Sequence, residues 1–83
     1  MTREIVFEKL NVIFRNNFDN DDIELTDETS SEDIEDWDSL EQINLIVAIQ
    51  DAFKVKFNID EVNAMKNVGE MVDFILDKLV HKT

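Results

Sequence analysis

The sequence contains no cysteine, no proline and only one glycine among its 83 residues. The absence of cysteine excludes disulfides, zinc–cysteine sites and thiol nucleophiles, so any thiol that the protein uses must be added to it. The scarcity of glycine and proline argues against a turn-rich β fold and favours helices. No apolar run approaches the length of a membrane span, and the N-terminal residues lack the layout of a signal peptide. We therefore expect a cytoplasmic protein with no membrane insertion.

Basic residues are scarce as well. Eight lysines and arginines stand against 20 aspartates and glutamates, which gives a formal net charge of −12. Eleven of the acidic residues lie between positions 19 and 38, and no basic residue occurs between Arg15 and Lys54. Such a surface repels phosphate backbones and anionic lipids, which argues against nucleic-acid and membrane-surface binding. Its charge favours basic patches on partner proteins, although a solvated acidic loop accounts for many of the same residues.

Apolar residues recur at helical spacing in three segments. These segments are residues 3–17, 39–53 and 68–79. Each follows a residue type that caps helix N-termini, namely Thr2, Asp38 and Asn67. Asp38 and Asn67 are also followed three positions later by a glutamate, which is the spacing of a capping box. A short fourth helix is expected at about residues 59–63, where so few residues form a stable turn only when packed.

The segment between the first two helices, residues 19–38, is polar and acidic. Its scattered apolar residues would pin it to the body of the protein: Ile23, Leu25, Ile34 and Trp37. We expect a single domain over residues 1–83, folded as an all-α four-helix bundle with three long helices, one short helix and a long acidic loop between helices one and two. A chain of this size buries only about two-thirds of its unfolded surface, so its stability should be marginal. A monomer is expected.

Ser39 is the candidate functional residue, because it follows the capping residue Asp38 at the start of a strongly apolar helix. On the first helical turn its hydroxyl faces solvent, beside unpaired backbone N–H groups and the positive end of the helix dipole. This setting favours an attached phosphate by about 0.3–1 kcal/mol. Taken alone, Asp38-Ser39-Leu40 is also an ordinary helix start, in which Asp38 would stabilise the helix by about 1 kcal/mol.

A longer stretch is more specific than this tripeptide. Residues 35–43 have the sequence EDWDSLEQI, and LIVAI at 45–49 and DAF at 51–53 follow. This stretch resembles the phosphopantetheine attachment region of acyl carrier proteins. The resemblance covers nearly the whole chain, since an amphipathic first helix, a long acidic loop and the segment NVGEMVDFI at 67–75 follow the order of that family.

The resemblance implies a carrier and not an enzyme. A phosphopantetheinyl transferase would attach 4′-phosphopantetheine covalently to Ser39, and acyl groups would be held as thioesters on its terminal thiol. The partners would be that transferase, an acyl- or aminoacyl-loading enzyme, and downstream synthases or transferases. The tether would present the cargo to them at high effective concentration. No metal site is expected.

The resemblance also implies roles for the neighbours of Ser39. The residues expected to form the attachment site with Ser39 are Asp38 and Leu40. Those expected to contact partners are Trp37, Leu40, Glu41, Ile43 and Val47. Those expected to line an acyl pocket between helices two and three are Ile43, Ile46, Val47, Phe57 and Val62. Because each buried methylene contributes about 0.8 kcal/mol, a medium-length chain could offset an opening of the core, whereas a one- or two-carbon cargo could not. Core positions are expected for Leu45 and Ile49, and Trp37 is also expected to anchor the acidic loop.

Several positions depart from the carriers of primary fatty-acid synthesis. Asn44 and Gln50 stand where acidic residues are common in those carriers, Lys54 and Lys56 follow, and Phe57-Asn58 replaces a frequent Ile-Pro pair. Electrostatic steering toward the standard synthase enzymes should be weaker as a result. The pattern favours a free-standing carrier of a dedicated pathway, such as a specialised polyketide, aminoacyl or surface-polysaccharide route.

Other functions remain open at this point. The same motif would serve an aminoacyl or peptidyl carrier, and an acidic helical adaptor without a prosthetic group would use Ser39 only as a helix-start residue. A calcium loop beginning at Asp19 is opposed by Ile23 and Glu24, which occupy its fifth and sixth positions. His81, at the end of the last helix, is expected to complement the helix dipole, and no nucleophile–base pair is apparent.

Overall fold

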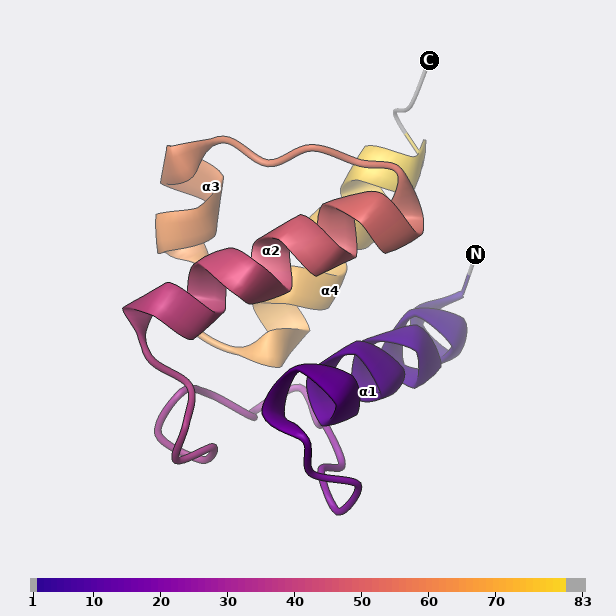
Figure 1. Cartoon of the computed structure of the whole chain (residues 1–83). Helices are drawn as coiled ribbons and strands as arrows, with labels where there is room; N and C mark the ends of the chain where they lie inside the picture. Colours follow the sequence, from indigo (N-terminus) through magenta and orange to yellow (C-terminus); the bar gives the residue numbers. More distant parts are fainter. Residues whose placement is uncertain (1, 81–83) are drawn as a thin grey trace.

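The computed structural model describes residues 2–80, which form four helices and no strand (Figure 1). The helices are α1 (Arg3–Phe18), α2 (Ser39–Phe53), α3 (Ile59–Ala64) and α4 (Val68–Val80). The all-α fold of three long helices and one short helix is thereby confirmed, and no helix end differs by more than one residue from its predicted position. His81 lies outside the described residues.

Capping side chains define the starts of the helices, as predicted. Thr2 Oγ1 accepts from the backbone N–H of Ile5 at 3.3 Å, and Asp38 Oδ1 accepts from that of Glu41 at 2.9 Å. Asn67 Oδ1 accepts from the N–H of Glu70 at 2.8 Å. Each bond satisfies a donor that has no partner within the helix, so these side chains explain where the helices begin.

The capping boxes, however, are not where their spacing predicted them. The Glu41 carboxylate accepts from the side-chain amides of Asn44 at 2.8 Å and Asn17 at 3.3 Å, which ties the start of α2 to α1. The Glu70 carboxylate accepts from the backbone N–H of Lys66 at 2.7 Å. A reciprocal box is instead formed in α3 by Asn58 and Glu61. Residues at capping-box spacing occur at the starts of α2, α3 and α4. At α2 and α4 the glutamate carboxylate accepts hydrogen bonds from other donors, so the reciprocal box forms at α3.

The hydrophobic core is built from α1, α2 and α4, and α1 packs against both of the others. The buried core residues of these helices are Val6, Leu10, Phe14, Leu45, Ile49, Phe53, Val68, Met71, Val72 and Ile75. The core positions predicted for Leu45 and Ile49 are confirmed, since both side chains are fully buried. The short helix α3 contains no buried residue, so it lies outside this core.

The segment between α1 and α2, residues 19–38, follows the surface without forming a helix (Figure 1). Ile23 and Leu25 are buried against the core, and Ile34 and Trp37 are partly buried. The indole of Trp37 meets the Phe14 ring edge-on with centroids 5.2 Å apart, and its Nε1 donates to Gln42 Oε1 at 2.6 Å. Trp37 therefore anchors the end of this segment directly before the start of α2, as predicted.

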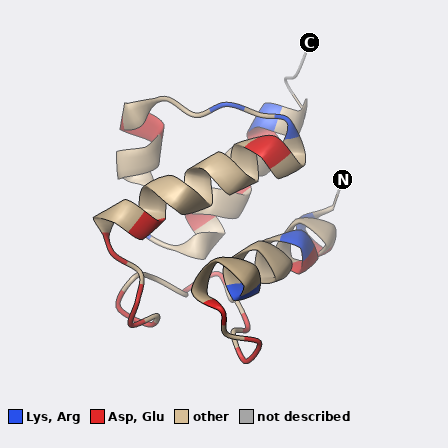
Figure 2. Cartoon of the chain, viewed as in Figure 1, with Lys and Arg blue, Asp and Glu red and all other residues tan. Residues whose placement is uncertain are grey.

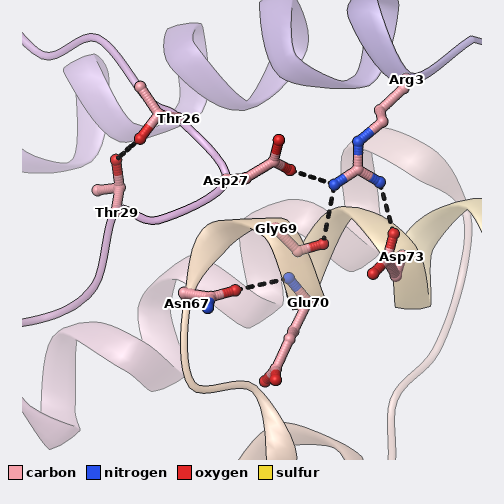
Figure 3. A network of polar contacts seen from close by, with 8 residues as sticks. All are labelled: Arg3, Thr26, Asp27, Thr29, Asn67, Gly69, Glu70 and Asp73. Atoms are coloured by element: carbon pink, nitrogen blue, oxygen red, sulfur yellow. Dashed lines mark hydrogen bonds and ion pairs between the residues drawn. The ribbon is translucent and has the colours of Figure 1, made fainter.

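The middle of this segment is bound to the start of α4. The backbone N–H of Val68 donates to the carbonyl of Thr29 at 2.7 Å, and that of Gly69 donates to the carbonyl of Asp27 at 2.9 Å. The guanidinium of Arg3 bridges the carboxylates of Asp27 and Asp73, so α1 joins the same network (Figure 3). Unpaired donors of α4 thus receive acceptors from a segment about 40 positions earlier in the chain.

Candidate functional site

Ser39 is the first residue of α2, and its side chain is exposed. The extended backbone of Asp38, with φ −114° and ψ −171°, turns the chain into the helix. The first backbone bond of the helix runs from Gln42 N–H to the Asp38 carbonyl at 2.9 Å, and the Asp38 carboxylate takes the N–H of Glu41. The N–H groups of Ser39 and Leu40 therefore remain available to an acceptor outside the helix.

An open hollow of about 500 Å³ lies beside Ser39, between the start of α2 and α3. Its lining residues are Ser31, Trp37, Asp38, Ser39, Gln42, Ile43, Ile59, Val62, Asn63, Met65 and Lys66. The lining includes apolar residues of α2 and α3, such as Ile43, Ile59 and Val62, together with polar residues such as Gln42, Asn63 and Lys66. The hollow therefore offers an extended group attached at Ser39 both an apolar contact and polar partners.

An apolar strip leads away from Ser39 along α2. Leu40, Ile43 and Val47 are 58–67% exposed, although all three are large hydrophobic residues. Their spacing places them on one side of the helix. Solvent-exposed apolar residues that lie next to one another on a helix mark an interaction surface more often than isolated ones do.

The residues predicted to line an acyl pocket are divided by the structure. Ile43 and Val62 line the hollow beside Ser39, whereas Val47 lies on the open surface. Phe57 is partly buried against the core. Ile46 is 7% exposed, yet it does not belong to the main hydrophobic cluster that contains every other buried hydrophobic residue of the described chain.

Several residues of the hollow were not predicted from the sequence. Ser31 comes from the long connection, while Asn63, Met65 and Lys66 come from α3 and the link after it. None carries a local signal, because no periodicity or spacing connects these positions with residue 39. Only the fold brings them to the N-terminal end of α2.

Comparison with known proteins places this four-helix domain in the class of carrier proteins whose cargo is held on an added arm. The family described as phosphopantetheine attachment site matches residues 8–75. The chain is similar to the solution structure of a holo acyl carrier protein from Geobacter metallireducens, with a TM-score of 0.86 and 46% identity, covering 92% of this chain and 87% of that one.

Curated relatives agree with that structure. The acyl carrier protein of Petrotoga mobilis is 33% identical over 79 residues, which are 95% of this chain and 93% of the relative. That of Lactobacillus acidophilus is 29% identical over 75 residues, or 90% of this chain and 94% of the relative. The chain belongs to the acyl carrier protein family. It is a carrier and not an enzyme, and its prosthetic group is covalent 4′-phosphopantetheine.

Membership in this family also sets the kind of partner. Acyl carrier proteins interact with a phosphopantetheinyl transferase and with enzymes that process acyl groups. None of the helices described here combines the length and the apolar content that crossing a bilayer requires.

Proposed function

We propose that Ser39 Oγ carries the phosphopantetheine arm and that the protein presents acyl thioesters on this arm to partner enzymes. The observation that supports this most directly is the exposed serine at the first position of α2, with two free backbone N–H groups beside it. Ser39 also lies within the part of the chain that matches the attachment-site family.

Attachment is a phosphoryl-transfer step in which Ser39 supplies the oxygen. A bond forms between Ser39 Oγ and the phosphorus that bears the pantetheine arm in coenzyme A. The bond from that phosphorus to the leaving 3′,5′-adenosine bisphosphate breaks, and the hydroxyl proton is lost to a base of the transferase. Asp38 holds the first turn of α2 in place during this step through its bond to Glu41 N–H.

The residues around Ser39 fit such an arm. The N–H groups of Ser39 and Leu40 and the ammonium of Lys66 suit the negative phosphodiester. Ile59 and Val62 offer an apolar surface to its dimethyl group, and the amides of Gln42 and Asn63 match its own amide groups. When bound, the arm supplies the thiol that the sequence lacks.

The exposed strip on α2 is the partner-binding surface in this proposal. Leu40, Ile43 and Val47 would be covered when a partner enzyme approaches the arm. Glu41 and Trp37 lie at the same end of α2, and both side chains are held by hydrogen bonds, Glu41 to Asn17 and Asn44 and Trp37 to Gln42. A partner would therefore meet a surface whose polar groups are already ordered.

We further propose that the protein serves a dedicated biosynthetic pathway. In α2 only Glu41 and Asp51 are acidic, so this surface is mostly uncharged, and the acidic residues gather on other segments (Figure 2). Asn44 bonds to Glu41, and Gln50 accepts from the N–H of Phe57 at 2.9 Å. These amides stabilise local structure without adding to the negative charge that would steer basic partners.

The attachment site is tested by intact mass after the protein is incubated with coenzyme A and a promiscuous phosphopantetheinyl transferase. The wild-type chain should gain the mass of one phosphopantetheine. The Ser39→Ala variant should gain nothing, whereas Ser31→Ala should be modified as fully as the wild type. Ser31 is a matched control, because it is an exposed serine that lines the same hollow. Modification of Ser39→Ala, or none of the wild type, would reject the site.

The pathway is tested by loading the modified protein. We expect slow charging and elongation by the enzymes of primary fatty-acid synthesis relative to a carrier from that pathway. Equal rates for the two carriers would contradict the dedicated role. Charging by an adenylating enzyme with an amino acid would identify an aminoacyl carrier instead.

A further inference from the structure

The position of α3 depends on few contacts. The helix has six residues, none of them buried, and an isolated helix of this length is not stable in water. The capping box formed by Asn58 and Glu61 closes its first turn. The contacts between this turn and the rest of the molecule therefore help to determine the position of α3.

Phe57 and Met65, which flank α3, pack against the core, and Lys78 of α4 connects the first turn of α3 itself to the rest of the molecule. Its Nζ donates to Glu61 Oε1 at 2.8 Å, and the same oxygen accepts from the backbone N–H of Asn58 at 3.0 Å. The ammonium also lies 5.8 Å from the centroid of the Phe57 ring. These bonds lower the pKa of the Glu61 carboxyl below its ordinary value, the bond from Lys78 contributing most. One α4 side chain thus contacts both Glu61 in the first turn of α3 and Phe57, which precedes the cap residue Asn58.

This contact is better shielded than an ordinary surface ion pair. The side chains of Lys78 and Glu61 are 29% and 21% exposed, whereas those of Lys54 and Asp51, the exposed pair at the end of α2, are 72% and 88% exposed. Partial burial weakens screening by water and salt. We name the contact of Lys78 with Glu61 and Phe57 the α3 clamp.

Residues of α3 also line the hollow beside Ser39. Ile59 and Val62 of α3 form its wall together with Gln42 and Ile43 of α2. Ile46 lies one turn further along α2, on the side of Gln42 and Ile43, and is buried although it stands outside the main core. Movement of α3 away from α2 would widen this hollow on the side of α2 that carries Ile46, without disturbing the core of α1, α2 and α4, to which α3 contributes no buried residue.

We infer that Lys78 is a specificity-determining residue for the cargo, because the α3 clamp sets how readily α3 moves from α2 and hence the shortest acyl chain that the protein shelters. This inference rests on the proposed function of Ser39. Each methylene that enters the hollow favours the sheltered state about fourfold. The strongest exposed ion pairs change an equilibrium constant about fivefold. We expect loss of the Lys78–Glu61 pair to shift the equilibrium between the packed and displaced positions of α3 by the same factor. Loss of the α3 clamp should therefore shorten the shortest acyl chain that the protein shelters by about one to two carbons.

The first experiment measures amide hydrogen exchange in the protein without the arm. Lys78→Met keeps the length of the side chain and removes its charge. The N–H groups of Val62 and Met65, bonded to the carbonyls of Asn58 and Val62, should exchange about fivefold faster in this variant, while amides of the α1 and α2 core keep their rates. Lys78→Arg should restore slow exchange. Lys54→Met, which removes the exposed pair, is the matched control and should leave α3 unchanged.

Unchanged exchange at Val62 and Met65 in Lys78→Met, or the same acceleration in all four helices, would overturn the clamp.

The second experiment uses the protein with its arm loaded with straight-chain acyl groups of increasing length. The rate at which hydroxylamine cleaves the thioester reports how exposed it is. In Lys78→Met, protection should begin at a chain about one to two carbons shorter than in the wild type and in Lys54→Met.

The two proposals fail in distinguishable ways. Identical protection curves for wild type and Lys78→Met would overturn the role of Lys78 in specificity while leaving the attachment site intact. Failure of Ser39 to accept the arm would overturn the proposed function and, with it, the inference about cargo length.

Discussion

At position 69 the absence of a side chain lets two distant segments meet. The N–H of Gly69 donates to the carbonyl of Asp27, and a Cβ at this position would lie 2.7 Å from that carbonyl oxygen. The backbone of Gly69 has no positive φ, so close approach, and not an unusual conformation, requires glycine here. Figure 3 shows Gly69 beside Asp27 and the guanidinium of Arg3, which also donates to the Gly69 carbonyl at 3.5 Å.

The Gly69→Ala variant tests this requirement. In an exposed helix, alanine is favoured over glycine by about 1 kcal/mol. Here we expect the opposite sign, a net loss of about 1–2 kcal/mol in the free energy of unfolding, because the added methyl group displaces a backbone carbonyl. Urea denaturation measures the difference. Asn16→Ala, at an exposed position in α1, is the control and should leave stability unchanged or raise it. A Gly69→Ala protein more stable than the wild type would show that the segment moves aside at little cost.

The helices differ in the kind of interaction that fixes their positions. The three long helices are positioned by buried apolar side chains, which respond little to pH. The short helix α3 has no buried residue of its own, and an ion pair between the Glu61 carboxylate and the Lys78 ammonium joins it to α4. A change in the charge of Glu61 should therefore affect α3 before it affects the others.

The pH dependence of α3 follows from the lowered pKa of Glu61. A lowered pKa in the folded state means that the ionised form is favoured there, so its stabilising effect is complete above the ordinary glutamate value of about 4.3. The effect is lost as the pH falls through the lowered pKa. We expect the amide resonances of Val62 and Met65 to shift in that acidic range in an NMR titration.

Glu61→Gln is the control for this titration, because it removes the titrating group and keeps an oxygen that can accept from Asn58 N–H. Other carboxylates, including the neighbouring Asp60, titrate in both proteins, so the difference between the two curves isolates Glu61. Identical curves for the wild type and Glu61→Gln would show that Glu61 does not control α3.

At the scale of the whole molecule, the formal charge of −12 opposes compaction. Acidic residues crowd the segment between α1 and α2, as Figure 2 shows, while the basic residues lie mainly near the ends of the helices. The pairs of Arg3 with Asp27 and Asp73 offset only a small part of this repulsion, since both carboxylates are more than half exposed.

We expect the melting temperature to rise with salt. Raising sodium chloride from about 0.01 M to about 1 M shortens the Debye length from about 30 Å to about 3 Å, which screens the repulsion. For a domain of this size each kcal/mol gained corresponds to about 4–8 °C. The double variant Glu35→Gln, Asp36→Asn should melt at a higher temperature than the wild type in low salt and respond less to added salt. A melting temperature that falls with salt would indicate that the ion pairs outweigh the repulsion.

Much of this structure follows from local sequence. The helix boundaries depend on apolar spacing over a few turns and on caps such as Thr2 and Asp38, which act within three residues of themselves. The exposure of Ser39 follows for the same reason, because the first position of a helix is defined by its cap. Trp37 was predictable as an anchor, since a large ring in a polar segment is favoured against the core.

The tertiary structure decided which distant residues share a site. Lys66 and Asn63 reach the hollow beside Ser39, Lys78 binds Glu61, and Asp27 approaches Gly69 only because the path of the chain brings them together. Competition among donors likewise drew the Glu41 carboxylate to Asn17 and Asn44. Such pairings join positions between which no short-range pattern exists, and each depends on how the whole chain packs. Local spacing therefore determined the helices and the serine at the start of α2, whereas packing determined the surroundings of that serine.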